Sequence, residues 1–156
     1  MNTRVLRAAT NIATVLGIGR LPTAPGTAAS IVALPLAWII AAFAGRFALM
    51  FAAIVVLGIG AWACEIYARE SGKNDPSECV IDEVAGQWIL CAFAPLTIPA
   101  FFVAFILFRL FDIVKPWPIS LVERRVPGGL GIMADDVVAA LMGCIILVVL
   151  GNLGVL

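Results

Sequence analysis

Four long stretches without a charged side chain dominate this sequence. Each has 18 or more residues, enough for a helix to cross a hydrocarbon core of roughly 30 Å. Hydrophobic residues make up 63% of the 156 residues and charged residues only 13%. The stretches are residues 21–45, 47–64, 84–108 and 137–156. The sequence therefore predicts an all-α, polytopic integral membrane protein, a helical bundle forming one transmembrane domain over residues 1–156.

The third stretch is interrupted near its middle by Pro95 and Pro99. Proline removes a backbone donor and restricts the residue before it. Two prolines four positions apart favour a helical hairpin, with helices over residues 80–94 and 98–114, above one long tilted helix. The hairpin gives about five membrane crossings, and the single helix gives four.

The basic residues favour the hairpin. With a cytoplasmic N-terminus and five crossings, nine of the ten basic residues fall on the inner side, and only Arg46 lies outside. This is the bias that the positive-inside rule expects. A single crossing in the third stretch would divide the basic clusters between the two faces. The zero net charge gives no indication of a nucleic-acid partner.

Shorter segments carry further expectations. Residues 2–16 predict an amphipathic helix at the membrane interface. A loop rich in glycine and proline follows, and Thr27 is expected to N-cap a first spanning helix over residues 28–44. Trp88 and Trp117 are expected to anchor at the interface. The four cysteines have no paired spacing and the chain lacks histidine, so we expect core cysteines and no zinc site.

Acidic residues at the edges of the apolar stretches are the second unusual feature. Asp82-Glu83, Asp112 and Asp135-Asp136 each lie within about one turn of an apolar stretch, and five crossings place them at one membrane face. Ionisable groups at membrane depth are costly and usually face a protein interior or a wet cavity. We therefore expect these five carboxylates to share one pocket at the cytoplasmic interface.

This set of side chains suits a particular chemistry. Carboxylate oxygens without histidine or a usable thiolate are ligands for a hard cation, above all Mg²⁺. Arg109 and Lys115, three residues on either side of Asp112, are placed to bind phosphate oxygens. The loop that carries Arg20 and Thr27 leads into a helix N-terminus, which also favours anions. Without histidine, a Ser-His-Asp triad and a phosphohistidine intermediate are excluded.

Other interpretations of the same residues stay open at this stage. Asp135 and Asp136 would also suit a capping role at the start of the last helix, and Arg109 with Asp112 a structural ion pair between helices. A small cation channel or transporter would also carry carboxylates at membrane depth, although charge would then be expected at mid-membrane or on both faces. A structural subunit of a larger membrane complex predicts no metal dependence.

Four sequence blocks stand out: GIGRLPTAPGTAAS at 17–30, VIDEVAGQWI at 80–89, FRLFDIVKPWPI at 108–119 and VPGGLGIMADDVVAA at 126–140. In sequence, order and spacing, these blocks resemble the phosphatidylglycerophosphatase A family of bacterial inner-membrane lipid phosphatases. The resemblance covers nearly the whole chain. Ala29 stands where the family more often has glycine.

The resemblance implies Mg²⁺-dependent removal of the terminal phosphate from phosphatidylglycerophosphate, a membrane phospholipid, to give phosphatidylglycerol and inorganic phosphate. It implies an enzyme among the bilayer lipids of the bacterial inner membrane, with its active site facing the cytoplasm. The oligomeric state is not predicted. The implied motif residues are Asp82, Glu83, Asp112, Asp135, Asp136, Arg109 and Lys115. We expect metal ligands among Asp82, Glu83, Asp112 and Asp136, a base in Glu83 or Asp135, and phosphate contacts from Arg109, Lys115, Arg20 and Thr27.

Overall fold

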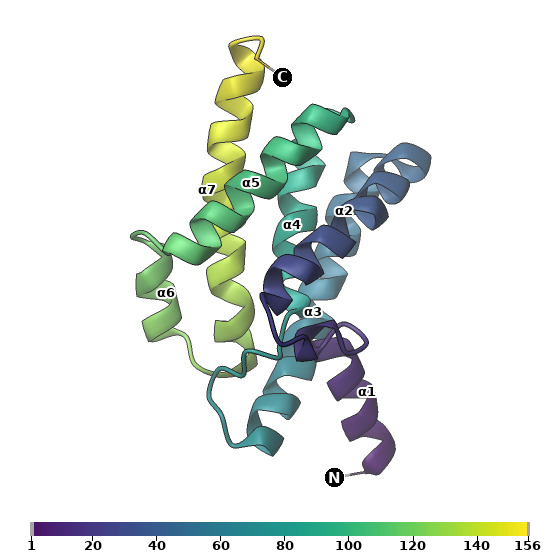
Figure 1. Cartoon of the computed structure of the whole chain (residues 1–156), viewed down its shortest axis with the longest axis vertical. Coiled ribbons are helices and arrows are strands. Elements are labelled where there is room, and N and C mark those ends of the chain that lie inside the picture. The colour runs from purple at the N-terminus through teal and green to yellow at the C-terminus, as the bar shows by residue number, and fades with distance from the viewer. Residues whose placement is uncertain (1, 156) are drawn as a thin grey trace.

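The computed structural model describes residues 2–155, which fold as a bundle of helices (Figure 1). No strand occurs in this described part of the chain, so the all-α prediction is confirmed. The elements are α1 (Thr3–Ala13), a 3-10 turn η1 (Ile18–Arg20), α2 (Pro25–Ala44), α3 (Arg46–Ser71), α4 (Ile81–Phe93), α5 (Ile98–Val114), α6 (Ile119–Arg125) and α7 (Gly128–Asn152).

The third apolar stretch forms the predicted hairpin of two helices. α4 ends before Pro95, and α5 places Pro99 in its first turn, where the missing backbone donor breaks no helical bond. The Thr97 side chain caps α5 by accepting a hydrogen bond from the Ala100 backbone N–H at 3.3 Å. By length and apolar composition, α2, α3 and α7 can each cross a membrane. α4 and α5, at 13 and 17 residues, are shorter, and five crossings stays a prediction.

The start of α2 differs from the sequence-based expectation. The helix begins at Pro25, preceded by Ala24 in the left-handed region at φ 45°. Thr27 therefore lies inside the first turn and does not cap the helix, so that prediction was wrong. Proline at the first helical position has its φ already set for the helix. This preference moved the start about three residues toward the N-terminus.

α4 lies at the centre of the bundle and packs against α2, α3, α5 and α7 (Figure 1). Small residues permit this close packing: a Cβ on Gly86 would meet the Phe108 ring of α5. Trp88 is only 9% exposed, and its indole N–H donates to the Ala33 carbonyl of α2 at 3.0 Å. The expectation of an interfacial Trp88 was therefore wrong. Trp117 is 75% exposed, and all four cysteines are buried and free.

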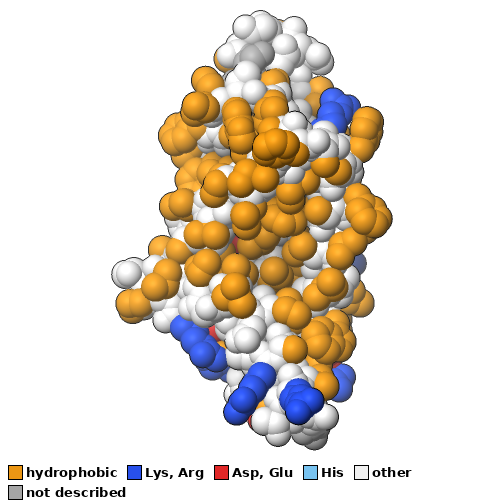
Figure 2. Space-filling model, turned by 90° about the vertical axis from the view of Figure 1, so that its right-hand side faces the viewer, with side chains coloured by type: hydrophobic (Ala, Val, Ile, Leu, Met, Phe, Trp, Pro, Cys, Tyr) orange, Lys and Arg blue, Asp and Glu red, His pale blue; other side chains and the backbone are white. Residues whose placement is uncertain are grey.

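The surface separates apolar and basic side chains along the bundle. Hydrophobic side chains cover the middle of the face in Figure 2, and Lys and Arg gather near its lower end. α1 confirms the predicted N-terminal helix, with Ala9 and Ala13 buried and Arg4 and Arg7 exposed. This helix packs on α3. Its location at a membrane interface stays a prediction.

Candidate active site

A pocket of about 370 Å³, here called the carboxylate pocket, lies between α2, α4, α5 and α7. All four sequence blocks, which are far apart along the chain, meet in its wall. Six carboxylates and two cations line it, an excess of negative charge that a bound cation would offset. The charged residues are Asp75, Asp82, Glu83, Asp112, Asp135, Asp136, Arg109 and Lys115.

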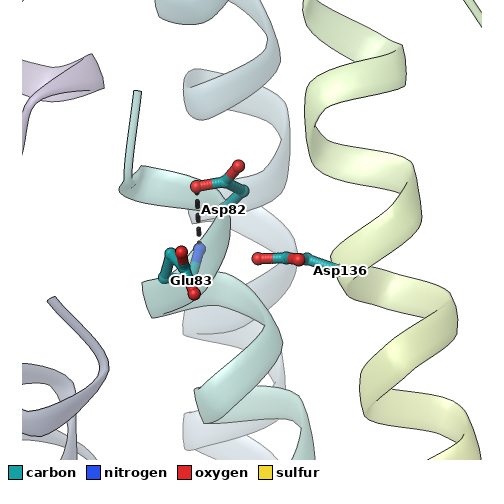
Figure 3. A group of neighbouring side chains, drawn as sticks. All are labelled: Asp82, Glu83 and Asp136. Carbon is teal, nitrogen blue, oxygen red and sulfur yellow. Dashed lines mark hydrogen bonds between the residues drawn. The ribbon is translucent and has the colours of Figure 1, made fainter. Parts of the chain in front are cut away.

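Asp82, Glu83 and Asp136 form a compact acidic group (Figure 3). The first two lie in the first turn of α4, and Asp136 points toward them from α7. One carboxylate oxygen from each lies within 4.8 Å of the others. The backbone N–H of Glu83 donates to Asp82 Oδ1 at 2.9 Å, which holds that side chain over the start of the helix.

Asp136 is buried, and part of its carboxylate has no partner within residues 2–155. It is 3% exposed, and its Oδ2 atom has no hydrogen-bond partner among the described residues. A buried carboxylate oxygen without a partner is strongly unfavourable, because it has lost its water and gained nothing in return. A hard divalent cation between these three carboxylates would satisfy it, so the residues present fit Mg²⁺.

Arg109 occupies the other side of the carboxylate pocket. Its Nη1 atom pairs with Glu83 of α4 and lies 2.6 Å from Asp112 Oδ2 on its own helix. All three side chains are 12–13% exposed. The Arg109–Asp112 ion pair therefore exists, within α5 and not between helices. The Nε atom of Arg109 is buried and unpartnered among residues 2–155, which leaves one donor free for a ligand.

The start of α2 packs against the Glu83 carboxylate. The Ser30 hydroxyl lies 3.5 Å from Glu83 Oε2 and donates to the Gly26 carbonyl at 3.1 Å. Gly26 sits so close to the Glu83 carboxylate that a Cβ there would collide with it. The PGT sequence thus brings a helix backbone directly against an acidic side chain, which only glycine permits.

Lys115 follows the last residue of α5, with its backbone in the left-handed region at φ 44°. Its Nζ atom lies 2.7 Å from Asp135 Oδ2 and 2.8 Å from Glu123 Oε1. Burial opposes its charge, yet hydrogen bonds to Asp135 and Glu123 raise the pKa of Lys115 above its usual range. The side chain is therefore a cation at neutral pH.

The last helix excludes one of the open interpretations. α7 begins at Gly128, so Asp135 and Asp136 lie about two turns inside it and do not cap its N-terminus. Asp135 and Asp136 are buried in the helix interior, at 7% and 3% exposed. The pocket that they line is therefore the reason that acidic residues occupy these two positions.

Of Thr27 and Arg20, both expected to contact phosphate, only Thr27 lines the carboxylate pocket. Thr27 lines the carboxylate pocket from the first turn of α2. Arg20 is exposed at the end of η1 and does not line the pocket. Asp75 does line it, although the sequence analysis did not select it. It lies in a polar loop beside buried Pro76, and nothing in its sequence neighbourhood distinguished it from other loop residues.

These features define a class of protein: a helical membrane protein whose pocket combines clustered carboxylates with an arginine and a lysine, groups that suit a cation and a phosphate. The comparisons with known proteins identify the family. The family model of phosphatidylglycerophosphatase A matches residues 11–151, and the chain belongs to this family.

Curated relatives cover most of the chain. Phosphatidylglycerophosphatase A of Escherichia coli (strain K12) is 35% identical over 144 residues, covering 90% of this chain and 82% of the relative. The Haemophilus influenzae protein of the same name is 36% identical over 137 residues, covering 86% and 83%. A Bacteroides thetaiotaomicron protein named "Putative phosphatidylinositol-3-phosphatase" is 38% identical over 146 residues, covering 88% and 90%. No solved structure gives a significant match.

Proposed function

We propose that this chain is a Mg²⁺-dependent lipid phosphatase that converts phosphatidylglycerophosphate into phosphatidylglycerol and inorganic phosphate. Two relatives bear the name of this activity. The observation that carries the proposal is the meeting of Asp82, Glu83 and Asp136 with Arg109 and Lys115 in one pocket. Since its relatives are phosphatases, the cation channel and the structural subunit are set aside as interpretations.

In this proposal the acidic group binds the metal, and the two cations bind the phosphate. Asp82, Glu83 and Asp136 would hold Mg²⁺, and Asp112 is the further candidate if Arg109 releases it. When bound, Mg²⁺ supplies Lewis-acid stabilisation of the charge on the phosphate. Arg109 and Lys115 each contact two carboxylates in the free protein, and exchange of one of these partners for phosphate oxygens would keep each cation paired with an anion.

The reaction itself is a hydrolysis. The oxygen of a water molecule attacks phosphorus, and the bond from phosphorus to the glycerol oxygen breaks. Asp135, or Glu83 where it does not hold the metal, would accept the proton of the attacking water and return it to the leaving oxygen. Arg109 and Lys115 would offset the charge that develops on the phosphate oxygens, an effect usually worth a factor of about 10²–10³ per donor.

The location of the carboxylate pocket at the polar end of the bundle suits a lipid headgroup as substrate. The carboxylate pocket lies at the same ends of the helices as α6 and the loop between α3 and α4, where the polar residues of the chain gather. The distribution of basic residues supports a cytoplasmic location for this end, in the inner membrane of a bacterium. The substrate would then meet the enzyme in the cytoplasmic leaflet.

The Bacteroides relative raises a second candidate substrate. Its name points to a phosphoinositide with a monophosphate on an inositol ring, and it matches this chain over 90% of its own length. Both lipids present a phosphate monoester at the end of a headgroup, so the same metal and cations would serve either.

A substrate comparison tests the proposal. Detergent-purified protein with Mg²⁺ should release phosphate from phosphatidylglycerophosphate at least tenfold faster, as kcat/KM, than from phosphatidylinositol 3-phosphate or phosphatidic acid. Preference for the phosphoinositide would replace the proposed substrate. Release from none of the three by a folded sample would contradict the phosphatase assignment.

A further inference from the structure

A second, larger pocket adjoins the carboxylate pocket on its polar side. This outer pocket has a volume of about 610 Å³ and is lined by the end of α3, the following loop, α6 and the start of α7. Asp75, Ile132 and Asp135 line both pockets, so the two pockets share part of their wall. Apart from the shared Asp135, the proposed reaction uses no residue of the outer pocket.

Two arginines in the outer pocket are free to bind an anion. Arg124 and Arg125, at the end of α6, are exposed and form no ion pair within residues 2–155. Most of the other charged side chains there have an ion-pair partner. Glu65 pairs with Arg69, Lys73 with Glu78, and Glu123 and Asp135 with Lys115. Asp75 forms no ion pair in the described chain, and it stands at the junction with the carboxylate pocket.

Lys115 connects the two pockets. Its ammonium contacts Asp135, which lines both, and Glu123, which lines the outer pocket alone. Arg109 and Lys115 line the carboxylate pocket among the carboxylates that they contact, and Arg124 and Arg125 line the adjoining outer pocket. A cation without a carboxylate partner lowers the energy of a nearby anion.

The reaction product requires a path of this kind. Inorganic phosphate is charged at neutral pH, so it does not pass into the hydrocarbon around the helices. The lipid product has acyl chains and would leave laterally into the bilayer, whereas inorganic phosphate must reach the aqueous phase. We propose that the outer pocket is a second anion site, which binds free inorganic phosphate as it leaves the carboxylate pocket. This inference rests on the proposed phosphatase function.

Product inhibition measures this site directly. The assay follows hydrolysis of phosphatidylglycerophosphate with Mg²⁺ while inorganic phosphate is added. The double variant Arg124→Gln/Arg125→Gln should raise the inhibition constant for phosphate about three- to tenfold, because two nearby charges are lost. KM for the lipid should stay within twofold. Arg124→Lys/Arg125→Lys keeps both charges and should retain most of the inhibition.

A matched control removes the same charge elsewhere. Arg4→Gln/Arg7→Gln also deletes two exposed cations, but these lie on α1, outside both pockets. It should leave the inhibition constant unchanged. Asp75→Asn should act in the opposite direction and lower that constant two- to threefold, since it removes a negative charge from the junction.

The outcomes separate the two proposals. An unchanged inhibition constant in the arginine double variant would overturn the outer site. So would an equal rise in the inhibition constant and in KM for the lipid, because the arginines would then bind the phosphate of the lipid headgroup. Absence of phosphate release from the unmodified protein would instead overturn the phosphatase function.

Discussion

Arg109 of α5 pairs with Glu83 of α4, a residue 26 positions earlier in the chain. The same guanidinium nitrogen lies 2.6 Å from Asp112. One cation therefore contacts two nearly buried carboxylates and joins two helices at the wall of the carboxylate pocket. Removal of one partner from a buried ion pair leaves an uncompensated charge, which is strongly destabilising.

Replacement of Arg109 tests both roles of this cation. Arg109→Gln should lower the free energy of unfolding by about 3 kcal/mol, because Glu83 and Asp112 both lose their partner. It should also reduce kcat/KM at least 100-fold. Arg109→Lys keeps the charge but not the forked geometry, so it should recover stability more than activity. Denaturation in detergent and a phosphate-release assay measure the two effects. A fully stable Arg109→Gln protein would show that the ion pairs do not hold the helices together.

Gly26 should tolerate no side chain. A methyl group there would meet the Glu83 carboxylate and lie 3.3 Å from Arg109 Nη1. Gly26→Ala should reduce the rate at least tenfold and destabilise the protein by about 1–3 kcal/mol. Gly58→Ala in α3 is the matched control, since a Cβ there meets nothing within 4 Å. It should be neutral or stabilise by up to about 1 kcal/mol. Equal effects of the two variants would count against the close approach of α2 to Glu83.

Asp136 should couple Mg²⁺ to stability. Added Mg²⁺ should raise the melting temperature of the unmodified protein, by an amount equivalent to about 2.7 kcal/mol at 100 times Kd. Asp136→Asn should lose this rise and at least 99% of the activity. Without metal, the variant should be as stable as the original or more so, because one of three crowded carboxylates is gone. A full Mg²⁺-induced rise in the variant would remove Asp136 from the ligand set.

Arg20 and Lys115 should differ, although both were expected to bind phosphate. Arg20 lies outside the carboxylate pocket, so Arg20→Gln should change kcat/KM less than threefold. Lys115→Gln removes a cation that faces the pocket and leaves Asp135 unpaired, so it should reduce kcat/KM at least 100-fold. Assays of the two variants side by side measure the contrast. A large effect of Arg20→Gln would return this residue to the site.

The sequence predicted the helices well where local chemistry decides them. The apolar lengths and the pair Pro95 and Pro99 are properties of neighbouring residues, and the hairpin between α4 and α5 followed from them. The start of α2 was missed because Thr27 and Pro25 both favour a helix start, and the proline determined it. Trp88 was misplaced because its burial depends on the central position of α4, which no local pattern encodes.

The sequence predicted which carboxylates lie at the same end of the helix bundle, but not which side chains contact one another. Charges at the edges of apolar stretches place Asp82, Asp112 and Asp136 at one level of the bundle, and the structure brings them into one pocket. Which carboxylate meets Arg109 depends on the rotation and tilt of α4 and α5 against each other. That orientation comes from tertiary packing, such as Gly86 against Phe108, and is not visible in the spacing.

The most direct test of the carboxylate–metal pocket is phosphate release from phosphatidylglycerophosphate by the purified protein, first with Mg²⁺, then with excess EDTA, and then for Asp82→Asn with Mg²⁺. We expect rapid release with Mg²⁺, loss of release in EDTA with recovery when Mg²⁺ is restored, and at least a 100-fold reduction in a folded Asp82→Asn protein. Undiminished release in EDTA, or near-normal turnover by Asp82→Asn, would contradict the account.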